Sequence, residues 1–137
     1  MAGGYNCAQS VATAYGTAFG IPEETLARIS AAFGGGVSRS DNICGAVSGA
    51  LMVLGLKYGA KNSSQPDAKA KTYAIGNEFI NEYKRRHGSV SCTGLLGYNI
   101  SIPEERKEAV EKKATAAVCP DVVRNAGKLL EEFLARD

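Results

Sequence analysis

The sequence contains no tryptophan, a single histidine and almost no excess of charge of either sign. One histidine, His87, cannot form a metal site that needs two imidazole ligands. The 16 basic residues nearly balance the 14 acidic ones, so the chain lacks the strongly basic surface that is typical of nucleic-acid-binding proteins. We therefore expect no nucleic-acid partner.

A long hydrophobic run is also missing. The longest weakly polar stretch, Ile43 to Leu56, is 14 residues long and contains Ser48 and three glycines. A membrane-spanning helix needs about 18 or more apolar residues. Residues 1–7 show no basic segment followed by an apolar one, which a secretory signal would have. These absences predict a protein that is not membrane-embedded and that resides in the cytoplasm.

What the sequence does contain is typical of one globular domain. Its 137 residues, 45% of them hydrophobic and 22% charged, can bury a sizeable core without help from disulfides. No repeat, low-complexity tract or internal boundary divides the chain, so we expect a single domain over residues 1–137.

Helical patterns dominate, and no segment alternates between apolar and polar residues as a half-exposed strand would. We therefore predict an all-α, single-domain bundle of five or six helices around a central helix rich in glycine and alanine. The expected helices run from Cys7 to about Phe19, from Pro22 to Phe33, from caps at Ser38–Asp41 to about Tyr58, from Asp67 to Arg86, from Pro103 to about Val118, and from Cys119 toward the C-terminus, with a single turn over 91–97.

Side-chain spacing indicates which helix faces are buried. Two sets of large side chains recur at intervals of three and four residues, as one face of a helix requires: Leu26, Ile29 and Phe33, and Ile75, Phe79 and Tyr83. In the central helix, Gly45 and Gly49 form a flank of almost bare backbone, and Gly55 is a third glycine. Because glycine destabilises a helix interior by up to about 1 kcal/mol relative to alanine, these glycines indicate close approach of a neighbouring helix or a bound group.

The four cysteines share one expected position, at or next to the N-terminal end of a helix: Cys7, Cys44, Cys92 and Cys119. Cys119 precedes Pro120, which favours Cys119 as a cap residue itself. Helix N-termini stabilise anions, so thiols there can have pKa values well below about 8.5. The thiolate is both the nucleophile and the metal ligand. All four cysteines are therefore candidate catalytic residues and candidate metal ligands.

A structural alternative stands beside this interpretation, because cysteine often serves as a small buried apolar residue. In the reducing cytoplasm, four cysteines favour metal binding or redox turnover over static disulfides. No two of them are spaced as Cys-x-x-Cys, so the sequence has neither a zinc ribbon nor a thioredoxin-like motif. Any shared site must be assembled by the tertiary fold.

A run of glycines precedes the central helix. Its backbone N–H groups, together with Gly45, are candidates for cofactor or anion binding: Gly34, Gly35 and Gly36. The run lacks the Gly-Lys-Ser/Thr ending of a phosphate-binding loop, and no strand precedes it. Two other interpretations of the glycine run remain open. It can be a helix end followed by a tight connection, or a loop that packs around a group bound to Cys44.

Five elements of the sequence together resemble a known family: Gly4-Tyr5-Asn6-Cys7-Ala8-Gln9-Ser10-Val11, Phe33-Gly34-Gly35-Gly36, Cys44-Gly45-Ala46-Val47-Ser48-Gly49-Ala50-Leu51, Cys92 and Cys119. The chain resembles the C_GCAxxG_C_C family of small four-cysteine proteins, to which a redox activity is ascribed. The family label places Gly before Cys, whereas this sequence reads Cys44-Gly45-Ala46, which we take as the same element. Members often have more residues ahead of the first cysteine, and many are encoded near transporter genes. The resemblance therefore implies a redox role and an association with a transporter system.

Three functions are compatible with these residues. The first is a thiol–disulfide protein, a thiol–disulfide oxidoreductase if it is an enzyme, with Cys44 as the most approachable thiolate, Cys7 as its resolving partner, no required cofactor and an unidentified redox partner. The second is a tetrahedral zinc or iron–sulfur site held by the same four cysteines. The third is a non-enzymatic helical binding module, such as a homodimer, whose glycine-rich helix accepts a partner helix.

Overall fold

The computed structural model describes residues 4–136 and is built from α-helices. Their bounds are α1 Cys7–Gly16, α2 Glu23–Ser30, α3 Gly34–Val37, α4 Gly45–Tyr58, α5 Pro66–His87, α6 Cys92–Leu96, α7 Pro103–Glu111 and α8 Ala114–Leu134. Short 3₁₀ turns over Thr17–Phe19 and Ala31–Phe33 extend α1 and α2. The predicted all-α class is confirmed, with seven helices of five or more residues and the four-residue α3 in place of the five or six expected.

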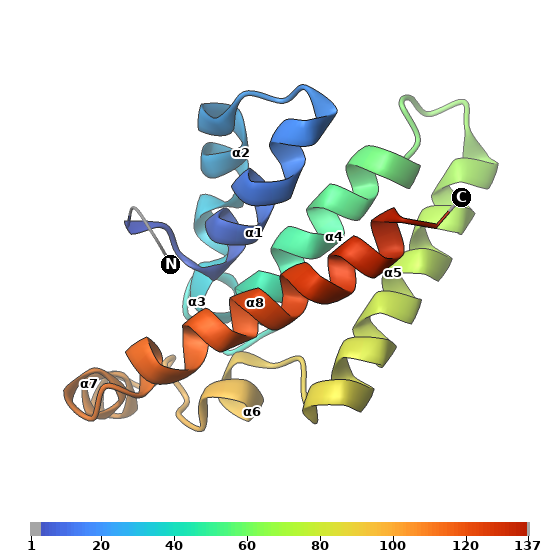
Figure 1. Cartoon of the computed structure of the whole chain (residues 1–137). Coiled ribbons are helices and arrows are strands. Elements are labelled where there is room, and N and C mark those ends of the chain that lie inside the picture. Colours follow the sequence, from blue (N-terminus) through green and yellow to red (C-terminus); the bar gives the residue numbers. More distant parts are fainter. Residues whose placement is uncertain (1–3, 137) are drawn as a thin grey trace.

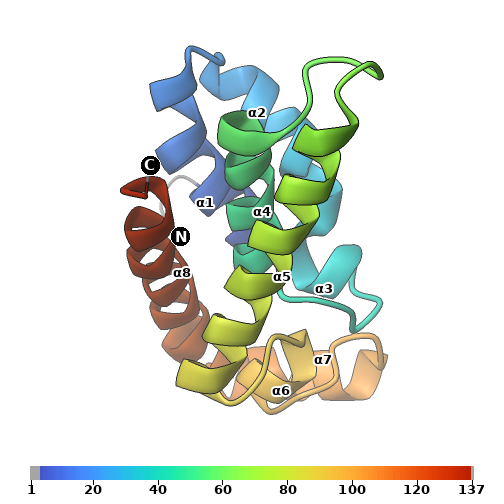
Figure 2. The same cartoon turned by 90° about the vertical axis from the view of Figure 1, so that its right-hand side faces the viewer.

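Helix α4 is the central helix, as the glycine and alanine pattern predicted. In Figures 1 and 2, α1, α5 and α8 surround it. Its residues Ala46, Val47, Ala50 and Val53 are fully buried. The aromatic side chains that complete the core come from α5 and α8: Phe79, Tyr83 and Phe133. Within the described residues, none of the helices combines the length and the apolar character needed to cross a bilayer.

The closest helix contact is between α1 and the glycine flank of α4. A Cβ atom at Gly49 would lie 2.6 Å from the carbonyl oxygen of Ala8, and one at Gly45 would lie 3.0 Å from the Ala8 nitrogen. The close approach predicted from Gly45 and Gly49 is therefore confirmed, and the neighbour is a helix. At Gly55 the same expectation is wrong, because nothing lies within 4 Å of an added Cβ.

The start of α1 is held by a capping box formed by Asn6 and Gln9. The Asn6 side chain accepts a hydrogen bond from the Gln9 N–H (2.9 Å), and the Gln9 side chain accepts one from the Asn6 N–H (3.1 Å). The amide groups of the same two side chains donate to the carbonyls of Ala31 and Ala27. These bonds fix the first turn of α1, which begins with Cys7, against α2 and the turn that follows it.

The central helix begins later than predicted, at Gly45 rather than near Ser38–Asp41. Residues from Gly35 to Arg39 have positive φ, including Val37 (65°), Ser38 (53°) and Arg39 (62°). These residues cannot belong to a right-handed helix, because such a helix requires a φ of about −60°. The segment therefore forms a separate left-handed turn, and Cys44 becomes the N-cap of α4.

The position predicted for Cys119 at the start of a helix is wrong. The break between α7 and α8 occurs at Lys113, which has a φ of 59°, so Cys119 and Pro120 lie inside α8. Proline lacks the N–H that would bond to the carbonyl four residues earlier. That carbonyl belongs to Ala116, an exposed residue, where water can replace the missing bond.

The predicted apolar faces are only partly correct. Phe79 and Tyr83 are fully buried in α5, and Leu26 is buried in α2. Ile29, expected on the same buried face as Leu26, is instead 54% exposed. The buried face of α2 is thus narrower than the face that the spacing of its apolar residues predicted.

The helix contact at Gly49 can be tested by substitution. We expect Gly49→Ala to destabilise the protein by about 1–3 kcal/mol, because the added methyl group would push α1 away from α4. Gly55→Ala is the matched control in the same helix, and we expect it to be neutral or stabilising by up to about 1 kcal/mol. Urea unfolding of the two variants measures the difference. Equal stabilities of the two would contradict this account of the contact.

Candidate functional site

One cavity of about 540 Å³ is lined by all four cysteines. Its lining residues come from the N-terminal ends of α1 and α4, from α3 and α6, and from the first half of α8, elements whose arrangement Figure 1 shows. Apart from the cysteines, six of the side chains on its wall are apolar: Ala31, Leu95, Leu96, Ile100, Val118 and Val122. The polar side chains on its wall, apart from the cysteines, are Asn6, Ser38, Arg39 and Thr115.

Cys7 and Cys44 are neighbours because α1 and α4 cross closely. Cys7 is the first residue of α1, and Cys44 directly precedes Gly45, the first residue of α4. A Cβ atom at Gly45 would lie 3.2 Å from the Cβ of Cys7. The lack of a side chain at Gly45 therefore allows the ends of the two helices, and their cysteines, to come together.

A second tertiary contact places Cys92 at the same cavity. Ile43 and Ser91 form an isolated antiparallel bridge between the segments that precede α4 and α6. Next to it, the Cys44 N–H donates to the carbonyl of Val90 (2.7 Å), and the Cys92 N–H donates to that of Asn42 (3.1 Å). The bridge holds the two helix starts, and hence Cys44 and Cys92, in register.

The start of α6 has two caps. The Ser91 hydroxyl accepts a hydrogen bond from the Gly94 N–H (2.9 Å), as expected for an N-cap. The Asp41 carboxylate accepts from both the backbone N–H and the hydroxyl of Thr93. Asp41, in the left-handed segment, thus fixes α6 and with it the wall that carries Cys92.

The glycine run takes part in shaping this wall. Gly34, Gly35 and Gly45 line the cavity, whereas Gly36 is buried behind it. At Gly36, with a φ of 70°, an added Cβ would lie 2.9 Å from the Cβ of Cys92. Gly36 therefore leaves room for Cys92, in addition to forming the tight connection that turn chemistry favoured.

The pKa of Cys7 is coupled to those of two other cysteines on the cavity wall. All four cysteines are thiols in the structure. Hydrogen-bonding interaction with Cys119 and with Cys44, together with burial, raises the pKa of Cys7 well above its ordinary value. The interaction with Cys7 lowers the pKa of Cys119 and that of Cys44, the latter to about 7. Cys7 therefore favours the thiol form, and its two neighbours favour the thiolate form more than an isolated cysteine does.

In addition to Cys7, two features of the environment change the pKa of Cys44, and they act in opposite directions. Burial raises its pKa, because a thiolate is poorly stabilised away from water, whereas the N–H groups of Ala46 and Val47 lower it. Sγ makes no conventional capping hydrogen bond, but it stands at the helix N-terminus, where these N–H groups favour negative charge. Cys44 is only 5% exposed, whereas the other three cysteines are partly exposed, so the expectation that it is the most approachable of the four is wrong. Its side chain lines the cavity.

Cys92 has a different environment. Burial, followed by the negative charges of Cys44, Cys119 and Asp41, raises the pKa of Cys92 to about 12. Cys92 is therefore a neutral thiol at physiological pH, although it follows a helix cap. A position at a helix start does not by itself set the charge of a thiol when burial and neighbouring thiolates oppose it.

Sequence reasoning named the cysteines and the glycines but not the other residues of the cavity. Arg39 and Thr115 are polar side chains on its wall that were not identified as site residues. The available signal for Arg39 was its place three residues after the last glycine of the run. Nothing in the sequence indicated that Thr115 and the apolar residues of α8 line the cavity. They do so because they lie on the same continuous helix as Cys119, and that helix was expected to begin at Cys119.

The donor arrangement required for a metal centre is not found among residues 4–136. No group of three or more His, Cys, Asp or Glu side chains in this range is placed to hold one metal ion. The cysteines line one cavity without the arrangement that a tetrahedral zinc or iron–sulfur site requires. We therefore assign no step to a metal.

Comparison with known proteins gives one match. A family model described as "Putative redox-active protein (C_GCAxxG_C_C)" matches residues 5–133, nearly the whole chain. The matched range includes the four cysteines and every helix of the structure except the last residue of α8. No curated protein and no solved structure matches the chain.

The interaction of Cys7 with Cys44 can be tested through the pH dependence of alkylation. We expect the alkylation rate of Cys44 to rise with pH around a midpoint near 7. Cys7→Ala removes this interaction and should shift this midpoint upward by about one unit or more, toward an ordinary thiol pKa. Cys7→Ser keeps a hydrogen-bonding group and is the matched control. Site-resolved mass spectrometry after iodoacetamide pulses measures the rates, and an unchanged midpoint in Cys7→Ala would refute the assignment.

Proposed function

Since the chain belongs to the C_GCAxxG_C_C family, we propose that it is a thiol redox protein whose reactive pair is Cys44 and Cys7. The family description supports redox activity in general terms. The observation that carries the specific proposal is the position of Cys7 and Cys44 at the adjoining starts of α1 and α4, on one cavity lined by all four cysteines, where the pKa of Cys44 is lowered to about 7. A depressed thiol pKa beside a second thiol is the arrangement that disulfide exchange requires.

In the first step, the Cys44 thiolate attacks one sulfur of a substrate disulfide. A bond forms between Cys44 and that sulfur, and the other half of the substrate leaves as a thiolate. Cys44 suits this role because its pKa of about 7 makes an appreciable fraction ionised at neutral pH. A thiol with a pKa near the ambient pH combines ionisation with good nucleophilicity.

In the second step, the Cys7 sulfur attacks Cys44 and expels the remaining substrate thiolate. Cys7 must lose its proton to do so, and Cys119 is its other hydrogen-bond partner. Cys119, whose pKa is lowered, accepts this proton as the base. The products are a Cys7–Cys44 disulfide, a Cys119 thiol and the reduced substrate, so two electrons pass from the protein to the substrate disulfide.

Cys92 has a supporting place in this scheme. It is neutral and partly buried, and no hydrogen bond to it contributes to the pKa shift of any other cysteine. We propose that it lines the cavity without entering the first disulfide. The reaction needs a compartment in which thiols persist, which is why we propose a cytoplasmic location.

Oxidation of the reduced protein should produce one particular disulfide. With one equivalent of diamide, we expect two of the four thiols to be lost and peptide mapping to identify Cys7–Cys44. Cys44→Ser and Cys7→Ser should abolish this product, whereas Cys92→Ser should leave it intact. Four titratable thiols after oxidation would refute the proposal. Retention of all function by a variant without cysteines would instead support a non-enzymatic binding module.

The role of Cys119 as a base predicts a kinetic separation of the two steps. In Cys119→Ser, we expect Cys44 to form a mixed disulfide at nearly the normal rate, because Cys119 takes no part in the attack. Resolution by Cys7 should slow by about 100-fold, the low end of what a positioned base contributes. Rapid-quench mass spectrometry separates the two rates, and normal resolution in this variant would remove Cys119 from the mechanism.

A further inference from the structure

The walls of the cavity indicate what kind of disulfide it accepts. We propose that the substrate is a small-molecule disulfide with an apolar body and a carboxylate, and that Arg39 binds the carboxylate. This inference rests on the thiol redox function proposed above and adds the substrate class. It is carried by the size of the cavity, the burial of Cys44 at its wall, the apolar side chains of that wall and the position of Arg39.

The size of the cavity and the burial of Cys44 favour a small molecule over a protein. Cavities that bind small molecules are commonly about 300–1,000 Å³, and this one is about 540 Å³. Cys44 is 5% exposed and lines the cavity. A disulfide on a folded protein would have to bring its backbone into the cavity to reach this sulfur, whereas a small disulfide enters whole.

The chemistry of the wall then limits the body of the substrate. Leucine, isoleucine and valine side chains from α6, the following loop and α8 form one side of the cavity: Leu95, Leu96, Ile100, Val118 and Val122. Burying apolar surface against them contributes roughly 25 cal/mol per Å² to binding. A short hydrocarbon chain on each side of the disulfide bond matches such a wall.

Arg39 is the cationic side chain among the described residues that line the cavity. Within residues 4–136 its guanidinium makes no ion pair. Asp41, two residues along the chain, directs its carboxylate to Thr93. The charge of Arg39 is thus available to an anion, and a guanidinium matches a carboxylate in two parallel hydrogen bonds.

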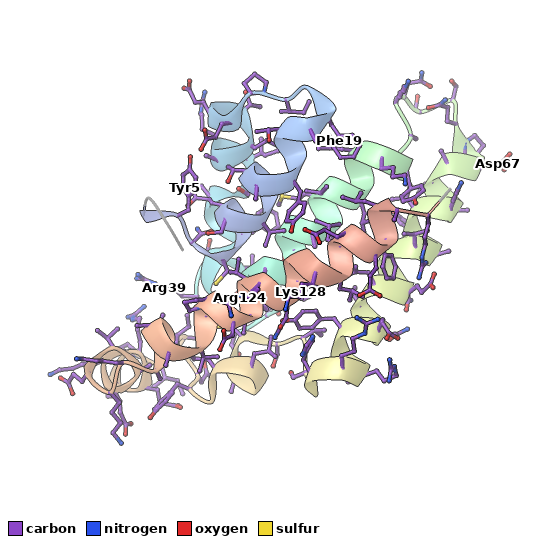
Figure 3. The ribbon with its side chains drawn as sticks, viewed as in Figure 1. Tyr5, Phe19, Arg39, Asp67, Arg124 and Lys128 are labelled. Carbon is purple, nitrogen blue, oxygen red and sulfur yellow. The ribbon has the colours of Figure 1, made fainter. Side chains whose placement is uncertain are left out.

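The backbone directs Arg39 toward this position. A Cβ at Gly35 would lie 3.0 Å from the Cγ of Arg39 and 3.2 Å from the Cδ1 of Ile100. The absence of a side chain at Gly35 therefore lets the stem of Arg39 lie across the backbone, next to the apolar wall. Figure 3 shows Arg39 at the end of the molecule where α3 lies near the first turns of α8. Arg39 itself has a φ of 62°, an unfavourable conformation for an L-residue that is common at ligand sites.

The positive charge of Arg39 compensates for negative charge elsewhere in the cavity. The cysteines of the cavity whose pKa is lowered are Cys44 and Cys119, and their thiolate forms would repel an anionic substrate. Arg39 offsets this repulsion at the rim, so the carboxylate can bind there while the disulfide reaches Cys44. The overall reaction converts one substrate disulfide and the Cys44–Cys7 dithiol into two substrate thiols and the Cys7–Cys44 disulfide.

Single-turnover reactions of the reduced full chain with three small disulfides test the proposal. The probes are 3,3′-dithiodipropionate, which is anionic, bis(2-hydroxyethyl) disulfide, which is neutral, and cystamine, which is cationic. We expect the second-order rate constants to fall in that order. In Arg39→Met, the rate with the anionic probe should fall about tenfold, as expected for loss of a charged hydrogen bond, while the rate with the neutral probe stays within twofold.

Two further variants separate charge from structure. Arg39→Lys keeps the charge and should retain most of the preference for the anionic probe. Arg124→Met is the matched control, because Arg124 is an exposed arginine of α8 that pairs with Asp121 and does not line the cavity (Figure 3). We expect it to behave like the unmodified protein with all three probes.

The outcomes distinguish the substrate class from the redox function. Equal rates with the three probes, or equal losses in Arg39→Met and Arg124→Met, would overturn the role of Arg39 and leave the redox function standing. Reaction with a protein disulfide but with none of the small probes would overturn the substrate class. Reaction with no disulfide at all, by a protein whose four thiols are titratable, would overturn the redox function itself.

Discussion

The close crossing of α1 and α4 is the contact on which the site depends. It requires two glycines, because a Cβ at Gly49 or Gly45 would meet the backbone of Ala8. The crossing joins the N-terminal ends of the two helices and so places Cys7 beside Cys44. Packing and chemistry therefore have the same origin here: the backbone contact that builds the core also forms the thiol pair.

The chemical character of the thiols follows from their mutual interaction in one cavity. Interaction with Cys119 and Cys44 raises the pKa of Cys7, and interaction with Cys7 lowers the pKa of both neighbours. The pKa of Cys92 is raised by burial and by its negative neighbours. Four identical side chains around one cavity thus differ in acidity: two have a lowered pKa and two have a raised one.

Much of the fold could be predicted from local signals. The start of α1 at Cys7, the bounds of α5 to within one residue and the buried stripe of Phe79 and Tyr83 are all present in the structure. Errors occurred where backbone geometry departed from residue preference. The left-handed turn before α4 includes Val37, a residue that rarely adopts positive φ, and the proline in α8 lies where a helix start was expected. Neither feature follows from local propensity, because tertiary contacts stabilise both.

The amino-acid sequence alone determined the helical class, the bare flank of α4 and the four cysteines as the chemically active residues, because periodicity, capping and residue type act over a few positions along the chain. Only the tertiary structure decided which cysteines change one another's pKa and that Arg39 lies on their cavity. Thiol pKa values depend on distances between residues that are remote in the chain, and those distances exist only after α1, α4, α6 and α8 have packed together.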